Sequence, residues 1–81
     1  MKILKFYTET CMPCRALGKL LEKVDVEVEP INALEDIEKV DIYNICSTPT
    51  LIFLDDDGNE YERTMGPVTL SKIQEIINKK K

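Results

Sequence analysis

The order in which strand-like and helix-like stretches follow one another is the feature that most limits the fold of this chain. The segment Lys2–Thr8 is rich in Ile, Leu, Phe and Tyr, which predicts a central strand covered on both faces. From Met12 to about Lys23, apolar residues recur at helical spacing. The next segment, Asp25–Glu29, alternates strictly between acidic and apolar side chains and predicts a second strand. A strand, a helix and a strand in this order predict a right-handed crossover between parallel strands.

The rest of the chain completes a single mixed sheet. Asn32 and Glu35 have the spacing of a capping box, so they predict the start of a second helix. The elements that follow are the end of that helix near Tyr43, a strand at Thr50–Leu54, a turn at Asp55–Asn59, a strand at Glu60–Thr64, and a helix from Leu70 capped by Ser71 or Thr69. The last two strands form a hairpin and must be antiparallel. We therefore expect one α/β domain over residues 1–81, with element order β-α-β-α-β-β-α, a four-stranded mixed sheet and three helices flanking it on both faces.

Composition and charge argue against several classes of function. Hydrophobic residues make up 43% of the 81 residues and charged residues 32%, which is typical of a folded globular domain. The net charge is −4 and histidine is absent, whereas nucleic-acid binding normally needs a basic face. No segment approaches the roughly 20 apolar residues of a membrane helix. The stretch Met1–Phe6 is too short and too interrupted by lysine to be a secretion signal. We expect a cytoplasmic monomer with no membrane or nucleic-acid partner.

Two of the three cysteines, Cys11 and Cys14, lie where the first strand ends and the first helix begins. The unpaired N–H groups and the dipole of a helix N-terminus stabilise a thiolate there. Cys11 is expected near the N-cap and exposed, whereas Cys14 shares an apolar stripe with Leu17 and should be more buried. A bridge across so short a loop would add little stability, so the pair favours redox chemistry. In this interpretation Cys11 attacks a substrate disulfide and Cys14 resolves the mixed disulfide.

Two other interpretations of the cysteine pair stay open at this point. Cys11 and Cys14 could form half of a zinc site, but zinc prefers four Cys or His ligands. The chain has three cysteines and no histidine, so a single copy would need a carboxylate ligand as well. The pair could also be two incidental buried cysteines, which its position at a strand-to-helix junction disfavours.

Three motifs together resemble the thioredoxin family, and they span most of the chain in the right order. Cys11-Met12-Pro13-Cys14 matches the paired-cysteine motif, Thr48-Pro49 precedes the third strand, and Gly66 follows the hairpin. The resemblance implies the short thioredoxin-like fold that glutaredoxins share, with protein-disulfide reductase activity, no bound cofactor and an upstream reductase. It also implies that the Thr48–Pro49 bond is cis and lies against the dithiol. The residues that it implies for substrate contact are Met12, Pro13, Thr48, Pro49 and Gly66.

Departures from the family pattern bear on the substrate. Thr10 stands where thioredoxins usually carry tryptophan, and Lys5 where they usually carry a buried aspartate. The segment Gly66–Thr69 lacks the Gly-Gly and acidic residue with which glutaredoxins bind glutathione. The sequence therefore favours protein disulfides as substrates. Glutaredoxin-like action on glutathione mixed disulfides and a non-catalytic metal-binding, cluster-binding or interaction module remain the alternatives.

Lys5, Gly18 and Cys46 are less certain in their roles. Lys5 could tune the dithiol electrostatically, could pair with Glu27 or Glu29 on the neighbouring strand, or could extend to water. Gly18 costs the first helix roughly 1 kcal/mol relative to alanine and so marks a bend or a close packing contact. Cys46 should sit at the same end of the molecule as Cys11, either as a small buried residue or as a secondary redox or dimerisation site.

Overall fold

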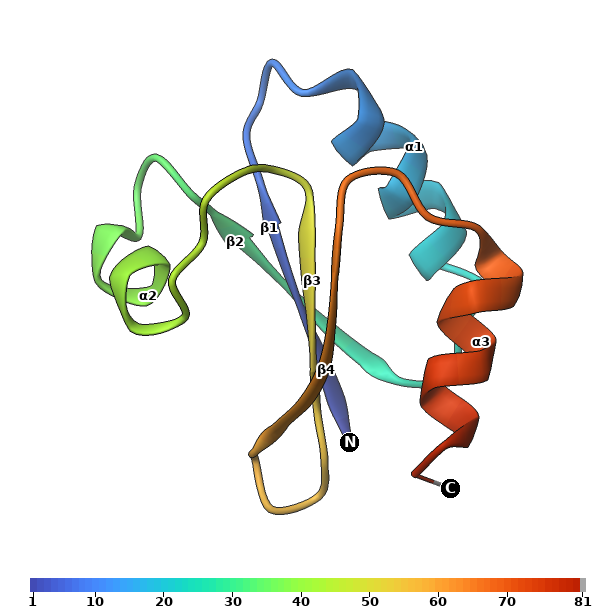
Figure 1. The fold of residues 1–81 in the computed structure, drawn as a ribbon. Coiled ribbons are helices and arrows are strands. Elements are labelled where there is room, and N and C mark those ends of the chain that lie inside the picture. The colour runs from blue at the N-terminus through green and yellow to red at the C-terminus, as the bar shows by residue number, and fades with distance from the viewer. Residues whose placement is uncertain (81) are drawn as a thin grey trace.

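The computed structural model describes residues 1–80 and has the expected order of elements (Figure 1). They are β1 (Lys2–Tyr7), α1 (Met12–Leu21), β2 (Glu27–Asn32), α2 (Ile37–Ile42), β3 (Thr50–Leu54), β4 (Glu60–Met65) and α3 (Leu70–Asn78). The four strands form one mixed sheet in the order β2-β1-β3-β4. β1 is parallel to β2 and antiparallel to β3, and β3 is antiparallel to β4. The predicted fold class is confirmed.

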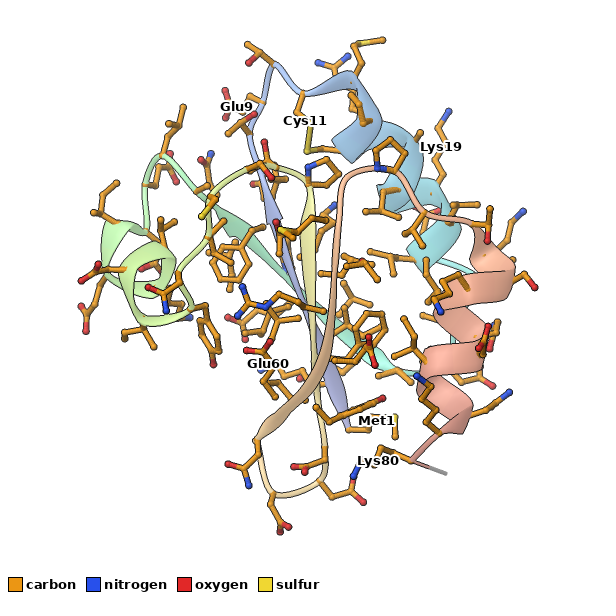
Figure 2. All side chains as sticks on the ribbon, in the orientation of Figure 1. Met1, Glu9, Cys11, Lys19, Glu60 and Lys80 are labelled. Atoms are coloured by element: carbon orange, nitrogen blue, oxygen red, sulfur yellow. A yellow bond between two sulfur atoms is a disulfide. The ribbon has the colours of Figure 1, made fainter. Side chains whose placement is uncertain are left out.

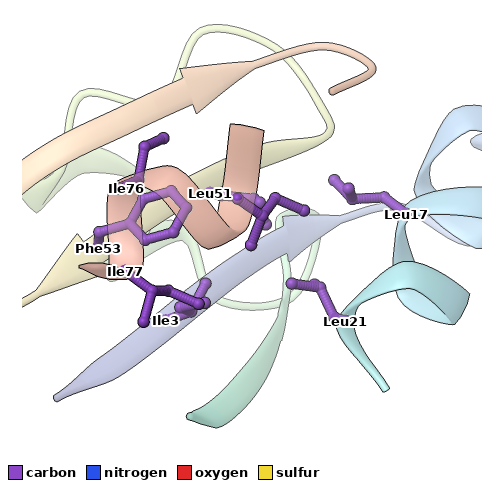
Figure 3. Close-up of a cluster of buried hydrophobic side chains, with 8 residues drawn as sticks. Ile3, Leu17, Leu21, Leu51, Phe53, Ile76 and Ile77 are labelled. Carbon is purple, nitrogen blue, oxygen red and sulfur yellow. The ribbon is translucent and has the colours of Figure 1, made fainter. Parts of the chain in front are cut away.

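The sheet separates the buried residues into two cores, and helices cover each of its faces. α1 and α3 lie on one face and α2 on the other (Figure 1). The larger core lies under α1 and α3 and is drawn in Figure 3; its buried members are Ile3, Leu17, Leu21, Leu51, Phe53, Ile73, Ile76 and Ile77. The smaller core lies under α2, where Val40, Tyr43 and Ile45 pack on Leu4, Phe6, Ile31, Ile52 and Leu54. Since β1 and β3 contribute to both cores, they are covered on both faces, as the apolar run in β1 predicts.

The second strand and second helix begin later than the sequence predicts. The parallel register pairs Lys2 with Glu27 and Tyr7 with Asn32, so β2 extends to the end of β1. Pro30 is tolerated because β2 is an edge strand. Asn32 therefore ends a strand, and its side chain accepts a hydrogen bond from the Leu34 amide at 2.9 Å. The expected capping box is wrong: the N-cap of α2 is Asp36.

The remaining boundaries differ little from expectation. α1 ends at Leu21, with Glu22 as its C-cap, rather than at Lys23. Thr69 caps α3, and its hydroxyl accepts a hydrogen bond from the Lys72 amide at 3.1 Å. Among the described residues, no helix is long and apolar enough to cross a membrane.

Candidate active site

The sheet register brings three separate parts of the chain to one end of the molecule. Phe6 in β1 is opposite Thr50 in β3, which in turn is opposite Met65 in β4. The loop after β1, the residues before β3 and the residue after β4 therefore share one end of the sheet. That end carries Cys11 and Glu9, and it is opposite the end that carries Met1 and Lys80 (Figure 2).

Cys11 is the N-cap of α1. Its backbone is extended, with φ −87° and ψ 106°, and its Sγ accepts a hydrogen bond from the Cys14 amide at 3.2 Å. Pro13 occupies the first turn, where a missing N–H costs no hydrogen bond. The Cys11 sulfur thus lies against the unpaired donors of a helix N-terminus, an environment that stabilises a thiolate.

Cys11 and Cys14 form a disulfide, with their Cα atoms 5.2 Å apart. The two sulfurs differ in accessibility, as the helical stripe predicts. Cys14 is 2% exposed, whereas Cys11 is partly exposed and is followed by the exposed Met12 and Pro13. An incoming disulfide can therefore approach Cys11 much more readily than Cys14.

Pro49 and Gly66 lie at the same end of the sheet as the end of β1, which leads to Cys11. The Thr48–Pro49 peptide bond is cis, as predicted from the family resemblance, and Pro49 is buried. The Gly66 amide donates a hydrogen bond to the Pro49 carbonyl at 2.8 Å. Gly66 has φ +79°, a left-handed conformation that favours glycine over residues with a side chain. Thr48, which precedes the cis bond, is partly exposed.

An apolar groove adjoins the dithiol on the side of α3. It lies between α1 and the β4–α3 loop, and its lining residues are Met12, Pro13, Ala16, Leu17, Leu20, Pro67 and Val68. Met12 is 70% exposed, and Met65, at the end of β4, is 63% exposed. Exposed flexible methionines suit contact with partners of varied shape.

Lys5 lies on the α1 face of the sheet, not at its α2 face. A Cβ atom at position 18 would lie 3.1 Å from the Lys5 Nζ, and that nitrogen lies 5.2 Å from the centre of the Tyr7 ring. Gly18 is thus a close packing contact. Glu29, one of the expected partners of Lys5, binds Lys2 at 2.6 Å and Lys39 at 3.0 Å instead.

The other expected partner, Glu27, binds Lys2 at 3.3 Å. The expectation that Lys5 pairs with either glutamate is therefore wrong. Hydrogen bonding to Lys2, and then to Lys39, holds the pKa of Glu29 below its ordinary value. Glu27 and Glu29 of β2 form ion pairs with Lys2 and Lys39. The Lys5 ammonium instead lies beneath α1, beside Gly18.

Cys46 is exposed, so the expectation that it is a small buried residue is wrong. Its thiol donates a weak hydrogen bond to the Asn44 carbonyl, with an Sγ-to-oxygen distance of 3.6 Å. It borders a groove that includes Ile37, Val40 and Ile45 and lies beside α2. Within residues 1–80, no three His, Cys, Asp or Glu side chains are arranged to hold a metal ion.

Comparison with known proteins agrees with this geometry. The family model for thioredoxin matches residues 1–79. The chain is 35% identical over 82 residues to a thioredoxin of Chlamydia pneumoniae, a match that covers 95% of this chain and 79% of that protein. It is 27% identical over 66 residues to an SPbeta prophage-derived thioredoxin-like protein of Bacillus subtilis, covering 82% of each.

Solved structures give the same relationship. A thioredoxin mutant from Halobacterium salinarum superposes with a TM-score of 0.87 at 25% identity, covering 98% of this chain and 73% of that one. The thioredoxin of Fasciola hepatica superposes with a TM-score of 0.86 at 26% identity, covering 99% of this chain and 80% of that one.

Proposed function

The chain belongs to the thioredoxin family, and we propose that it reduces disulfide bonds in other proteins by cycling Cys11 and Cys14 between dithiol and disulfide. The observation that carries this proposal is the unequal burial of two bonded sulfurs at the start of α1. An accessible sulfur capping a helix suits attack, and a buried sulfur one turn away suits intramolecular resolution.

The reaction proceeds in two exchanges. The Cys11 thiolate attacks one sulfur of the substrate disulfide, and the other substrate sulfur leaves with the electron pair and takes up a proton. The Cys14 thiolate then attacks the Cys11 sulfur. The bond between Cys11 and the substrate breaks, and the second substrate sulfur leaves as a thiol. The substrate gains two electrons and the protein dithiol is oxidised to the Cys11–Cys14 disulfide.

The surface that receives the substrate would consist of Met12, Pro13, Thr48, Pro49 and Gly66. The exposure of Met12 and the neighbouring apolar groove support contact with apolar side chains on either side of a substrate cysteine. Main-chain pairing of an extended substrate segment with Thr48 would add affinity without demanding a particular sequence. Together these contacts favour proteins over small disulfides as substrates.

The rest of the cycle is proposed on the same basis. An upstream disulfide reductase would return the protein to the dithiol form, because the exchange leaves Cys11 and Cys14 oxidised. We place this cycle in the cytoplasm, where thiols are kept reduced, and treat the working species as a monomer.

Insulin reduction with dithiothreitol as the electron source tests the activity. The protein should accelerate the precipitation of the reduced insulin B chain, and both Cys11→Ser and Cys14→Ser should abolish this acceleration. Cys46→Ser is the matched control and should retain the parent rate. A glutathionylated peptide, used as the alternative substrate, should be reduced more slowly than insulin. If the parent protein left the rate of B-chain precipitation at its background value, the proposal would be contradicted.

A further inference from the structure

A pocket of about 420 Å³ beside Cys14, on the side of α1 away from α3, has charged side chains among its lining residues. Its lining residues are Lys5, Tyr7, Thr8, Glu9, Cys14 and Arg15. Cys14 lines this space and Cys11 does not, so the charged side chains there share a pocket with the buried cysteine. The inference that follows concerns Cys14, and it rests on the resolving role proposed above.

Lys5 is the cation in this space that comes from beneath the helix. Cys14 and Gly18 are four residues apart, so they share a helix face at a separation of about 6 Å along the axis. The Lys5 Nζ lies against the position where a side chain on Gly18 would begin. It therefore occupies the helical stripe one turn below Cys14, on the face that α1 turns toward β1.

A side chain at position 18 would displace this ammonium. A Cβ atom there would lie 3.1 Å from the Lys5 Nζ, closer than ordinary van der Waals contact. The flexible lysine would yield, because the helix backbone is fixed by packing of Leu17 and Leu21 into the core. The glycine thus leaves room for the cation.

The other charged and titratable groups near Cys14 are Arg15, Glu9 and Tyr7, which line the same pocket. Arg15 and Glu9 are exposed, and the Arg15 guanidinium donates to the Glu9 carbonyl at 3.4 Å. Tyr7 places its ring centre 5.2 Å from the Lys5 Nζ, and Glu22 lines a neighbouring pocket together with Lys5 and Gly18. Within residues 1–80, Lys5 forms no ion pair with a carboxylate, so its charge is not neutralised at close range.

We propose that Gly18 is a positioning residue for catalysis: it leaves space for the Lys5 ammonium beside Cys14, and this charge favours the Cys14 thiolate in the resolving step. In that step the Cys14 sulfur bonds to Cys11 while the substrate sulfur leaves with the electron pair. Lys5 neither forms nor breaks a bond. It raises the fraction of Cys14 that is ionised when the mixed disulfide forms.

The size of the effect follows from two opposing terms. Removing a nearby cation typically lowers the thiolate fraction about tenfold at a pH where the thiol is mostly protonated. A more basic thiolate is about threefold more nucleophilic, since nucleophilicity rises with roughly the 0.4–0.5 power of basicity. The resolving step should therefore slow about threefold in Lys5→Met.

A small aromatic disulfide, dithiobisnitrobenzoate, separates the two steps when every protein compared carries Cys46→Ser, which removes the exposed third thiol. The reduced protein releases one thionitrobenzoate when Cys11 attacks and a second when Cys14 resolves, and stopped-flow absorbance follows both. Lys5→Met should slow the second release about threefold and shift its rate profile to higher pH. The first release should change less than twofold.

Gly18→Ala should reproduce this pattern while Lys5 is still present. In Lys5→Met/Gly18→Ala the second release should be no slower than in Lys5→Met alone, because the alanine acts only through the lysine. Lys19→Met removes the same charge from the outer side of α1 (Figure 2) and should leave both releases unchanged. Circular dichroism melts check that each variant is folded.

Three results would overturn the proposal. An unchanged second release in Gly18→Ala would mean that the glycine positions nothing. Slowing by Gly18→Ala that persists in the Lys5→Met background would show a packing effect. Equal slowing of both releases would show a general change at the site. Release of a single thionitrobenzoate by the Cys46→Ser protein would instead contradict the dithiol function itself, which separates failure of the proposed function from failure of the positioning role.

Discussion

At the scale of single residues, the Cys11 sulfur combines the role of helix cap with the proposed role of nucleophile. This Sγ accepts a hydrogen bond from the Cys14 amide and so caps the helix. The same sulfur forms the disulfide with the Cys14 Sγ. On reduction, the helix N–H groups are in place to stabilise the thiolate that forms there. The cap and the proposed nucleophile are the same atom, so a substitution that removes the sulfur acts on both. A serine at position 11 can keep the cap but not the chemistry.

Glu29 gives a residue-scale prediction about pH. Its pKa is lowered, first by the hydrogen bond from Lys2, so its stabilising effect is present above the ordinary value of 4.5 and is lost as the pH falls through the lowered value. Glu29→Gln should therefore lower the free energy of unfolding at neutral pH, and the difference should vanish in acid. Because a third of the side chain is exposed, we expect less than about 1 kcal/mol.

Urea unfolding at several pH values measures this effect. Glu27→Gln is the control: Glu27 is on the same strand, also contacts Lys2 and is 71% exposed, so its substitution should matter less. A difference for Glu29→Gln that grows toward acid pH would contradict the assigned direction of the pKa shift.

The residue roles differ in how far the sequence could predict them. The position and unequal burial of Cys11 and Cys14 follow from local helix geometry, and the sequence predicts both. The location of Lys5 depends on which face of β1 α1 covers, and alternation within one strand does not decide this. The exposure of Cys46 depends on how the chain leaves α2. The sequence shows Gly18 as an unfavourable helix residue, but the neighbour that explains it comes from another element.

At the scale of elements, α3 depends on a single cap and a single apolar face. Thr69 caps the helix, and Ile73, Ile76 and Ile77 bury that face in the larger core. The sequence offers both Thr69 and Ser71 as caps, and the structure selects Thr69. The bounds of β2, in contrast, could not be predicted from its own sequence. Its register is set by pairing with β1 and not by its alternating pattern.

The selection of Thr69 can be tested through stability. Thr69→Ala should lower the free energy of unfolding by about 1 kcal/mol, because the Lys72 amide loses its acceptor. Ser71→Ala removes the rival cap and should be nearly neutral, since Ser71 is an exposed residue inside the helix. Thermal melts of both variants give the comparison, and a larger loss for Ser71→Ala would contradict the observed cap.

At the scale of the whole molecule, the mixed sheet gathers the chemistry at one end. β1 delivers Cys11, the start of β3 delivers Pro49, and the end of β4 delivers Gly66. The placement of Thr48–Pro49 against the dithiol is what the family resemblance implies. The observed register brings the end of β1, the start of β3 and the end of β4 to one end of the sheet. The two cores hold the strands in that register, so stability and activity depend on the same pairing.

The central claim is that Cys11 attacks a protein disulfide and Cys14 resolves the product. The most direct measurement is to trap the mixed disulfide with insulin. Incubation of reduced Cys14→Ser with insulin should yield a covalent complex linked through Cys11, visible by non-reducing electrophoresis and mapped by mass spectrometry. Cys11→Ser should yield none, and dithiothreitol should release the complex. A complex that forms through Cys14 in Cys11→Ser, with none in Cys14→Ser, would contradict the account.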